Sequence, residues 1–190
     1  MDNTGLHGDV EKKGASIILA SGKSLYFDKP DPRVMDPEMI AASLAKLCRW
    51  TGQCLEFFSV AQHCVLVSRL VPEEHAMAGL MHDASEAFIG DINRPLKYAM
   101  DHAAPGVLSG IEDKLHEAIA KRHGFEFPFD PSVKIADNIS LATEKRDILP
   151  DDGTPWMGLP EPLDAPLRPV GPKAAYTMWI SRFEELGGVL

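Results

Sequence analysis

The stretch Leu80-Met81-His82-Asp83-Ala84-Ser85-Glu86-Ala87-Phe88 (LMHDASEAF) places three ionisable side chains inside a run that is otherwise apolar or small. In a helix, His82 and Glu86 are four positions apart and share a face, and Asp83 is one position round. Burying a carboxylate without a partner is costly, so a buried segment of this kind needs a cation nearby. The stretch therefore predicts a helix with a polar site in the protein interior, and a divalent metal ion would serve as the cation.

The rest of the chain predicts an all-α fold with a small N-terminal β-hairpin. Residues 16–27 contain two β-prone stretches around Ser21-Gly22-Lys23, which indicates the hairpin. Apolar spacing and cap residues predict helices over residues 36–50, 59–71, 73–90, 109–122, 131–149 and 173–186. Between the third and fourth of these we expect a turn or a short helix broken by Pro95.

One domain is expected, because 190 residues can bury roughly 70% of their unfolded surface around a single core. We assign residues 1–14 to a loose tail and residues 15–190 to the domain, with its helical core at about 36–146. Residues 150–172 hold seven of the fifteen prolines and are expected to form an extended surface segment before the C-terminal helix over 173–186.

Two further polar residues lie on the apolar faces of predicted helices. His63 lies between Val60 and Val67, and Asp137 lies four residues from both Val133 and Leu141. With the His-Asp pair at 82–83, three helices then supply two imidazoles and two carboxylates. This donor set suits Mn, Fe, Co, Ni or Zn and is poor for Ca. We predict one divalent transition metal held by His63, His82, Asp83 and Asp137.

Composition excludes several classes of function. The net charge of −9 argues against binding to a nucleic-acid polymer, which requires many Lys and Arg contacts to phosphate. The three cysteines, an odd number without metal-ligand pair spacing, are expected to be reduced thiols. Because the sequence has no apolar run long enough to span a bilayer and no hydrophobic signal core, we expect a cytoplasmic protein that does not bind membranes.

The motifs resemble those of the HD-domain metal-dependent phosphohydrolases. His63, His82-Asp83 and Asp137 match the pattern H...HD...D of that family. The strings CRW, SVAQH and MHDASEAFIGDINRPLKY resemble the bacterial 5'-deoxynucleotidases and the phage-encoded deoxynucleoside triphosphate triphosphohydrolases. The match covers roughly residues 44–142. It implies a helical HD fold, one metal held by these four residues, cleavage of phosphate esters of deoxynucleotides, and a homodimer.

The resemblance also implies roles for further residues. Glu86 and Asp91 match acidic residues that handle the attacking water or the leaving group. Arg49 and Trp50 match a pair that lines the nucleoside pocket and leaves no room for a 2'-hydroxyl, and Lys97 matches a phosphate-binding lysine. Just upstream of Lys97, Arg94 is a further candidate for binding phosphate.

Several alternatives stay open. Hydrolysis of a deoxynucleoside monophosphate is the leading expectation, and hydrolysis of a deoxynucleoside triphosphate to release triphosphate uses the same motifs. A third possibility is a nucleotide sensor without catalysis. Residues 51–62 are apolar and acidic where the compact nucleotidases carry a basic residue, so contacts to the phosphate or base are expected to differ there. The other histidines are expected not to bind metal: His7, His75, His102, His116 and His123.

Overall fold

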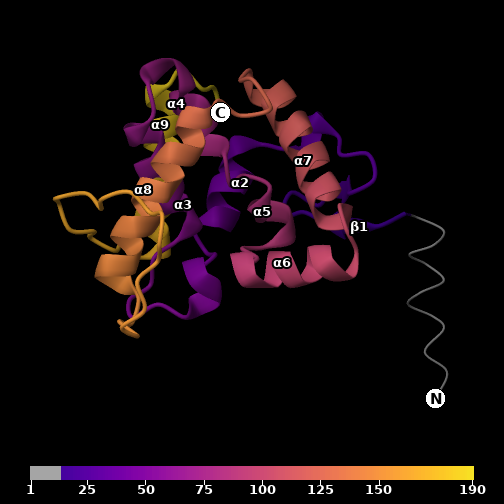
Figure 1. The fold of residues 1–190 in the computed structure, drawn as a ribbon. Coiled ribbons are helices and arrows are strands. Elements are labelled where there is room, and N and C mark those ends of the chain that lie inside the picture. The colour runs from indigo at the N-terminus through magenta and orange to yellow at the C-terminus, as the bar shows by residue number, and fades with distance from the viewer. Residues whose placement is uncertain (1–13) are drawn as a thin grey trace.

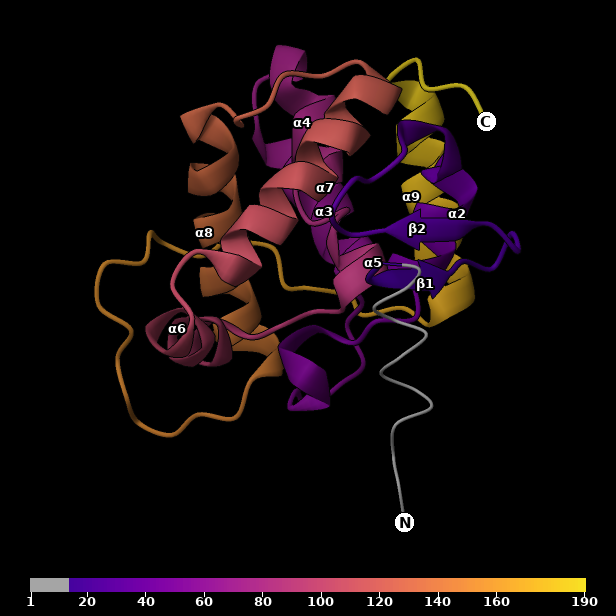
Figure 2. The same cartoon turned by 90° about the vertical axis from the view of Figure 1, so that its right-hand side faces the viewer.

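The computed structural model describes residues 14–190, so the predicted tail and His7 fall outside the described residues, except for Gly14. The β-hairpin is confirmed: β1 (Ser16–Ile18) pairs in antiparallel fashion with β2 (Ser24–Tyr26), with Ser16 opposite Tyr26. Leu25 is fully buried, so the hairpin contributes one side chain of its second strand to the core. Figure 2 shows the hairpin lying across the side of the helical body.

The predicted all-α fold is confirmed as well (Figure 1). The helices are α2 (Pro37–Leu44), α3 (Val60–Leu70), α4 (Ala76–Met81), α5 (Glu86–Ile89), α6 (Arg94–Ala103), α7 (Val107–His123), α8 (Pro131–Ile148) and α9 (Pro172–Glu185). Short 3-10 turns lie at Pro32–Val34, Arg49–Gly52 and Glu73–His75. Helix α3 begins as its sequence predicts, because the Ser59 side chain accepts a hydrogen bond from the Gln62 backbone N–H.

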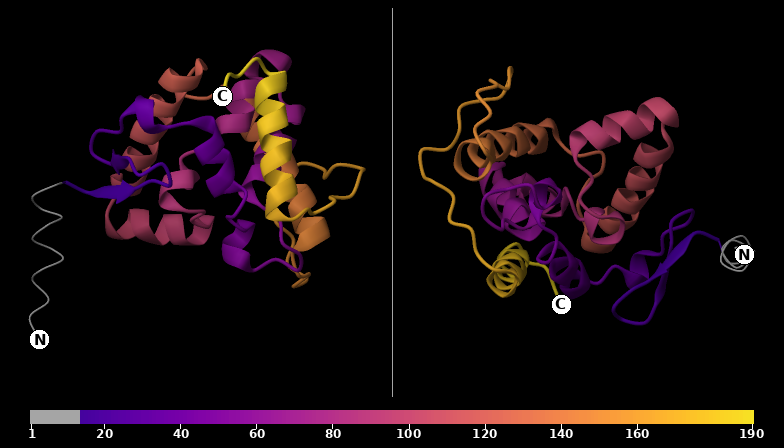
Figure 3. Two further views of the ribbon diagram at one scale, coloured as in Figure 1. Left: turned by 180° about the vertical axis from the view of Figure 1, so that it is seen from behind. Right: turned by 90° about the horizontal axis from the view of Figure 1, so that it is seen from below.

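Helix α3 lies at the centre of the molecule. It packs against α4, α8 and α9, and the view from below in Figure 3 shows it between α8 and α9. The main core gathers around it, with Trp179 and Phe183 of α9 stacked at 5.6 Å between ring centroids. A smaller apolar cluster joins α3 and α4 to α8 through Val67, Ala78 and Val133. A polar residue on the inner side of α3 is therefore enclosed on several sides.

The first predicted helix is wrong at its C-terminal end, because α2 ends at Leu44 and not at Trp50. Beyond it the chain pairs with the segment before α3: Arg49 N donates to Phe58 O at 2.8 Å, and Val60 N donates to Leu47 O at 3.0 Å. These bonds use backbone groups that a continuing helix would need. They turn residues 47–60 into a closed loop that starts and ends beside α3.

The predicted helix over 73–90 is also wrong, because residues 82–85 interrupt it between α4 and α5. In a regular helix, Gly79 O would accept the backbone N–H four residues later. Instead, Nδ1 of His82 lies 2.8 Å from Gly79 O. The following bonds tighten to a three-residue step, such as Glu86 N to Asp83 O at 3.0 Å. The polar residues of LMHDASEAF therefore lie on a tight turn and not on one helix face.

Pro95 does not break a helix, contrary to the prediction. It lies in the first turn of α6, where its missing N–H costs nothing, and Asn93 caps that turn by accepting from Leu96 N. Residues 150–170 form no helix or strand, as the prolines predict. Within residues 14–190, none of the helices is long and apolar enough to cross a membrane.

Candidate metal centre

The structure brings the four predicted metal ligands together from three places in the chain. His63 lies on α3, His82 and Asp83 lie on the turn after α4, and Asp137 lies on α8. Nε2 of His63 lies 3.1 Å from Nε2 of His82 and 3.5 Å from Oδ1 of Asp137. Oδ2 of Asp83 lies 3.4 Å from the Nε2 atoms of both histidines.

These distances fit a shared ion. Ligand atoms held about 2.1 Å from one ion lie about 3.0 Å apart along an octahedral edge and about 3.4 Å apart along a tetrahedral edge. Nε2 of His63 lies 3.1 to 3.5 Å from the ligand atoms of the other three residues, and Oδ2 of Asp83 lies 3.4 Å from Nε2 of His82. One atom from each of His63, His82 and Asp137 lies within 4.8 Å of the others, which is the spread expected of a group that could hold a metal ion. The two-nitrogen, two-oxygen set suits a first-row transition ion.

Both histidines are oriented so that Nε2 faces this centre. The Gly79 carbonyl accepts from Nδ1–H of His82, and the Glu144 carboxylate accepts from Nδ1–H of His63 at 2.7 Å. With a proton on Nδ1, Nε2 of each ring is the nitrogen that faces a metal. Although burial and the charge of Arg49 lower it, the Glu144 and Asp137 carboxylates raise the pKa of His63 to about 9, so a metal would replace a proton on its Nε2. Burial lowers the pKa of His82 and so favours the neutral ring.

The two aspartates are ionised by their surroundings. Although burial raises the pKa of Asp83, the nearby histidines and Arg49 outweigh it and lower that pKa overall. Burial also opposes ionisation of Asp137, and its contact with His63 prevails, so the pKa lies well below its usual range. Oδ2 of Asp137 accepts from Lys134 at 2.6 Å, which leaves Oδ1 directed at His63. Both carboxylates are therefore charged and suited to bind a cation.

Cys64 gives a second candidate group with His82 and Asp83. Burial, with the charges of Asp83 and Glu86, raises the pKa of the Cys64 thiol well above its usual value. A protonated thiol is a poor ligand, so the histidine and aspartate set fits a metal better. All three cysteines are free thiols, as predicted.

Glu86 and Asp91 lie beside the centre, and each has one buried carboxyl oxygen without a partner in the range that the structure describes. Oε2 of Glu86 and Oδ2 of Asp91 are buried, and neither has a hydrogen-bond partner among residues 14–190. Burial and the charge of Asp83 raise the pKa of Glu86 well above its usual value, and the same two causes raise that of Asp91. Buried carboxyl groups with raised pKa are typical of sites that move protons.

Arg49 and Trp50 also reach the centre. Nη1 of Arg49 lies 3.3 Å from Oδ2 of Asp83. Trp50 and Thr51 have φ values of 61° and 55°, in the left-handed region that residues other than glycine seldom adopt. Hydrogen bonds hold this loop: Trp50 Nε1 donates to Glu144 at 3.0 Å, and Asn93 Nδ2 donates to Thr51 Oγ1 at 3.0 Å. Backbone strain that side chains maintain in this way is typical of functional loops.

Lys97 and Arg94, the two other residues predicted to bind phosphate, differ in how close they lie to the centre. Lys97 is half-buried and donates to Glu112 at 2.8 Å, and the charges of Glu86 and Asp83 also contribute to its raised pKa, which burial opposes. Arg94, the first residue of α6, is exposed. In the described part of the chain, no hydrogen bond or ion pair links Arg94 to the centre. Lys97 therefore lies within the field of the site, and the structure does not bring Arg94 to it.

Sequence reasoning missed Glu144. Its side chain is fully buried on α8, two turns after Asp137. The spacing of Asp137, Ser140 and Glu144 at steps of three and four puts them on one helix face, and this was the available signal. Because Lys145 and Arg146 follow it, the sequence predicts that Glu144 lies at an exposed helix end, and its role could not be recognised.

His116 was also assigned wrongly. It was expected on a polar helix face, but its ring packs at 5.4 Å from that of Phe127 and 5.1 Å from that of Phe129. Burial lowers its pKa to about 4, so the ring is neutral. Its Nε2 is buried and has no hydrogen-bond partner within the described residues. The sequence gives only a weak indication that His116 is buried, because its neighbour Leu115 is apolar but the surrounding stretch of α7 is charged.

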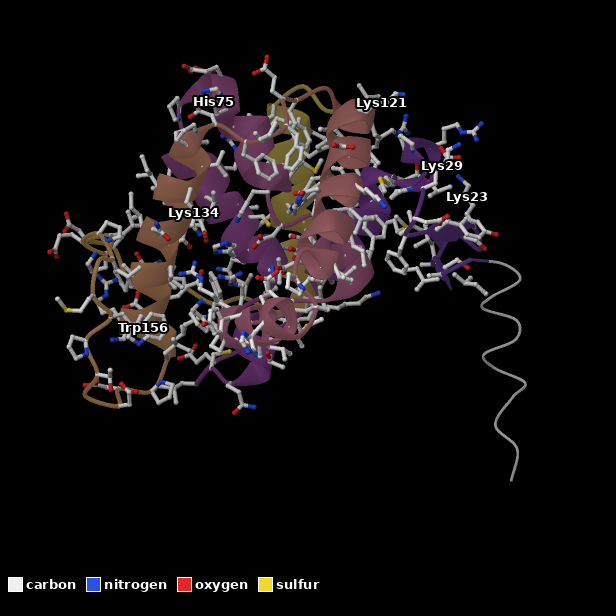
Figure 4. The ribbon with its side chains drawn as sticks, turned by 45° about the vertical axis from the view of Figure 1, so that its right-hand side comes forward. Lys23, Lys29, His75, Lys121, Lys134 and Trp156 are labelled. Carbon is white, nitrogen blue, oxygen red and sulfur yellow. The ribbon has the colours of Figure 1, made fainter. Side chains whose placement is uncertain are left out.

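The Pro-rich segment, residues 150–170, lies beside the same site. The ring of Trp156 lies 5.6 Å from that of Trp50, and Figure 4 shows Trp156 near the C-terminal end of α8. Side chains of α3 and α8 hold the segment, among them Gln62, Thr143 and Asp147. They bond to the backbone of Leu163, Leu167, Arg168 and Val170 at 2.7 to 3.0 Å.

Comparison with known proteins identifies relatives but gives no activity. The uncharacterized protein YfdR of Escherichia coli is 40% identical over 173 residues, which cover 90% of this chain and 94% of YfdR. An uncharacterized protein of Rhodobacter capsulatus is 32% identical over 143 residues, which cover 68% of this chain and 71% of that protein. No family model matches the chain.

Proposed function

Because the chain belongs to the same family as the Escherichia coli protein YfdR, whose name states no activity, we propose a function from the site itself. The protein is a metal-dependent phosphohydrolase that acts on 2'-deoxynucleotides. Its reaction is that of a 5'-deoxynucleotidase, which converts a deoxynucleoside monophosphate to the deoxynucleoside and phosphate.

One observation carries this proposal. Potential ligand atoms of His82, Asp83 and Asp137 lie 3.1 to 3.5 Å from Nε2 of His63, beside one buried oxygen each of Glu86 and Asp91 that has no partner among the described residues. A divalent ion bound there would polarise a phosphoryl oxygen and lower the pKa of a bound water molecule. The HD-type pattern that the sequence resembles supports the same chemistry.

The chain's own residues take complementary roles. Burial and the charge of Asp83 raise the pKa of Glu86, and a bound dication would offset that charge and favour the Glu86 carboxylate. We assign Glu86 as the base that accepts the proton of the attacking water, because its buried Oε2 has no partner among the described residues. Asp91, whose raised pKa favours the protonated form, donates to the leaving oxygen. Arg49 and Lys97 offset phosphate charge, and Trp50 packs against the deoxyribose.

The charges favour a monophosphate over a triphosphate. Arg49 is already paired with Asp83 and Glu144, and Lys97 is paired with Glu112. A triphosphate carries more charge and would need additional cations. The nearest candidate, Arg94, is exposed on α6. Release of triphosphate from a deoxynucleoside triphosphate is therefore our second choice.

A non-catalytic sensor is disfavoured by Glu86 and Asp91. Each of them has a buried carboxyl oxygen without a partner among the described residues, which is costly, and a protein that only binds a nucleotide has no use for such an oxygen. The resemblance further leads us to propose a homodimer, for which light scattering should give twice the 20.8 kDa of the chain. We also propose that the protein is cytoplasmic.

The test combines metal binding with two product assays. Full-length protein is loaded with Mn²⁺ or Co²⁺ and incubated with deoxy- and ribonucleoside mono- and triphosphates, and phosphate and triphosphate are measured separately. We expect phosphate from deoxynucleoside monophosphates, and loss of both metal and turnover in Asp137→Asn. Triphosphate as the product would select the second choice. Bound metal and nucleotide without turnover would select the sensor, and a wild-type protein that binds no metal would end the proposal.

A further inference from the structure

Glu144 connects two parts of the site that lie far apart in the sequence. Its Oε1 accepts from Nδ1 of His63 at 2.7 Å and from Ser140 Oγ at 3.0 Å. Its Oε2 accepts from Nε of Arg49 at 3.2 Å and from Nε1 of Trp50 at 3.0 Å. One oxygen therefore serves a candidate metal ligand, and the other serves the loop that carries the candidate nucleotide-binding pair.

These contacts define what Glu144 can do. An ionised carboxylate offers about four acceptor positions, and four donors occupy those of Glu144. The side chain is fully buried. It has no acceptor left for a metal ion, a water molecule or a substrate. Glu144 is therefore a positioning residue, which acts through the groups that it holds.

On the metal side, Glu144 sets the His63 ring. A carboxylate that accepts from Nδ1–H fixes the tautomer and turns Nε2 toward the centre. Ser140, one turn earlier on α8, lies 3.0 Å from the same Nδ1 and steadies the carboxylate. Asp137, two turns earlier, faces His63 as well. One face of α8 thus presents a ligand and the group that orients another ligand.

On the nucleotide side, Glu144 holds a strained turn. Trp50 sits at φ 61°, and its indole N–H bonds to Glu144, 94 residues away in sequence. Arg49 is held between Glu144 and Asp83, which is itself one of the candidate ligands. Loss of Glu144 would release the indole from its position and leave the buried Arg49 guanidinium with one carboxylate instead of two.

We propose that Glu144 couples the metal ligand His63 to the pair Arg49 and Trp50, so that metal affinity and selection of the deoxyribose depend on one buried carboxylate. The proposal rests on the function proposed above. It goes beyond that function because it names a residue that contacts neither metal nor substrate and yet affects both metal affinity and sugar preference.

The central variant is Glu144→Gln, which keeps the shape but replaces one acceptor oxygen by an NH₂ group. That group cannot accept from either pair of donors. We expect metal affinity, measured by calorimetry with Mn²⁺ or Co²⁺ and no nucleotide, to fall by about 10- to 100-fold. We also expect the preference for deoxy- over ribonucleoside monophosphates, measured as a ratio of kcat/KM values, to fall.

The matched control is Ser68→Ala on α3. Ser68 is buried, and its Oγ donates to Ala76 O at 2.8 Å and accepts from Nε of Arg182 at 3.0 Å; within the described residues its side chain has no hydrogen bond to the centre or to residues 150–170. This variant should lower the unfolding temperature while it keeps the metal affinity and the sugar preference of the wild type. A control that lowers all three measures as Glu144→Gln does would reduce Glu144 to a packing role.

A second variant tests the coupling itself and does not depend on the folding of Glu144→Gln. Trp50→Phe keeps the aromatic ring but removes the N–H that bonds to Glu144. If the coupling exists, Trp50→Phe should change metal affinity by at least about two-fold when Glu144 is present. The same substitution should leave metal affinity unchanged in the Glu144→Gln background. Unchanged affinity in Trp50→Phe, or a loss of metal affinity alone in Glu144→Gln, would overturn the coupling while wild-type hydrolysis stands. If wild-type protein binds no metal and hydrolyses nothing, both proposals fail together.

Discussion

Gly79 is the point at which the packing of α4 on α3 can be tested most directly. A Cβ atom added there would lie 3.1 Å from Ser68 Cα, 3.1 Å from Val71 Cγ2 and 3.4 Å from Ser68 N. Two of these three atoms belong to the backbone of α3, which cannot rotate away. The two helices would have to separate by a few tenths of an ångström.

The expected magnitude follows from two opposed terms. In the substitution Gly79→Ala, alanine favours the helix by about 1 kcal/mol. Overpacking a tight contact costs about 1 to 3 kcal/mol. The free energy of unfolding should therefore be unchanged or fall by up to about 2 kcal/mol. Because Gly79 O accepts from His82, the shift should also turn that ring and weaken metal binding.

Urea unfolding followed by circular dichroism measures the first effect, and calorimetric metal titration measures the second. The control is Gly110→Ala in α7, where an added Cβ meets nothing within 4 Å. That control should gain about 0.5 to 1 kcal/mol. If Gly79→Ala gains as much and binds metal as tightly as the wild type, the close contact does not govern the position of His82.

Two other predictions concern single ionisable groups. Glu86→Gln should retain bound metal and lose at least about 100-fold in turnover, as measured by phosphate release at saturating metal; wild-type turnover would remove Glu86 as the base. Nε2–H of His123 donates to Met35 O at 3.0 Å, and burial lowers the pKa of the ring. Its neutral form is therefore favoured in the fold, so this contribution to stability is present above about pH 6.5 and is lost as the pH falls through the lowered pKa. Between pH 7.5 and 5.5 the unfolding free energy should fall more in the wild type than in His123→Gln, and equal losses would contradict the assignment.

Local patterns predicted much of this fold because they repeat within a few residues. The apolar stripe of α3, its Ser59 cap and the Pro131 start of α8 are all such patterns, and the structure has helices there. The inward positions of His63 and Asp137 follow from the same stripes. The convergence of the four ligand residues could be proposed for this reason, together with the resemblance to a known motif.

The predictions that were wrong concern residues whose partners are distant in sequence or whose hydrogen bonds compete with those of a helix. The break after Met81 arises because the His82 ring binds Gly79 O, a choice that helix propensity does not encode. The early end of α2 arises from pairing between residues 47–49 and 58–60. Glu144 could not be recognised because its partners Arg49 and His63 lie 95 and 81 residues away.

The attachment of the Pro-rich segment has an evolutionary consequence. Helices α3 and α8 grip it through its own main chain, at the N–H of Leu163, Leu167 and Val170 and at the carbonyl of Arg168. Any residue except proline can occupy the three donor positions without loss of those bonds. Related proteins can therefore acquire new side chains in residues 150–170 next to Trp50. Such changes would alter which molecules these proteins bind while the residues of the candidate metal centre stay the same.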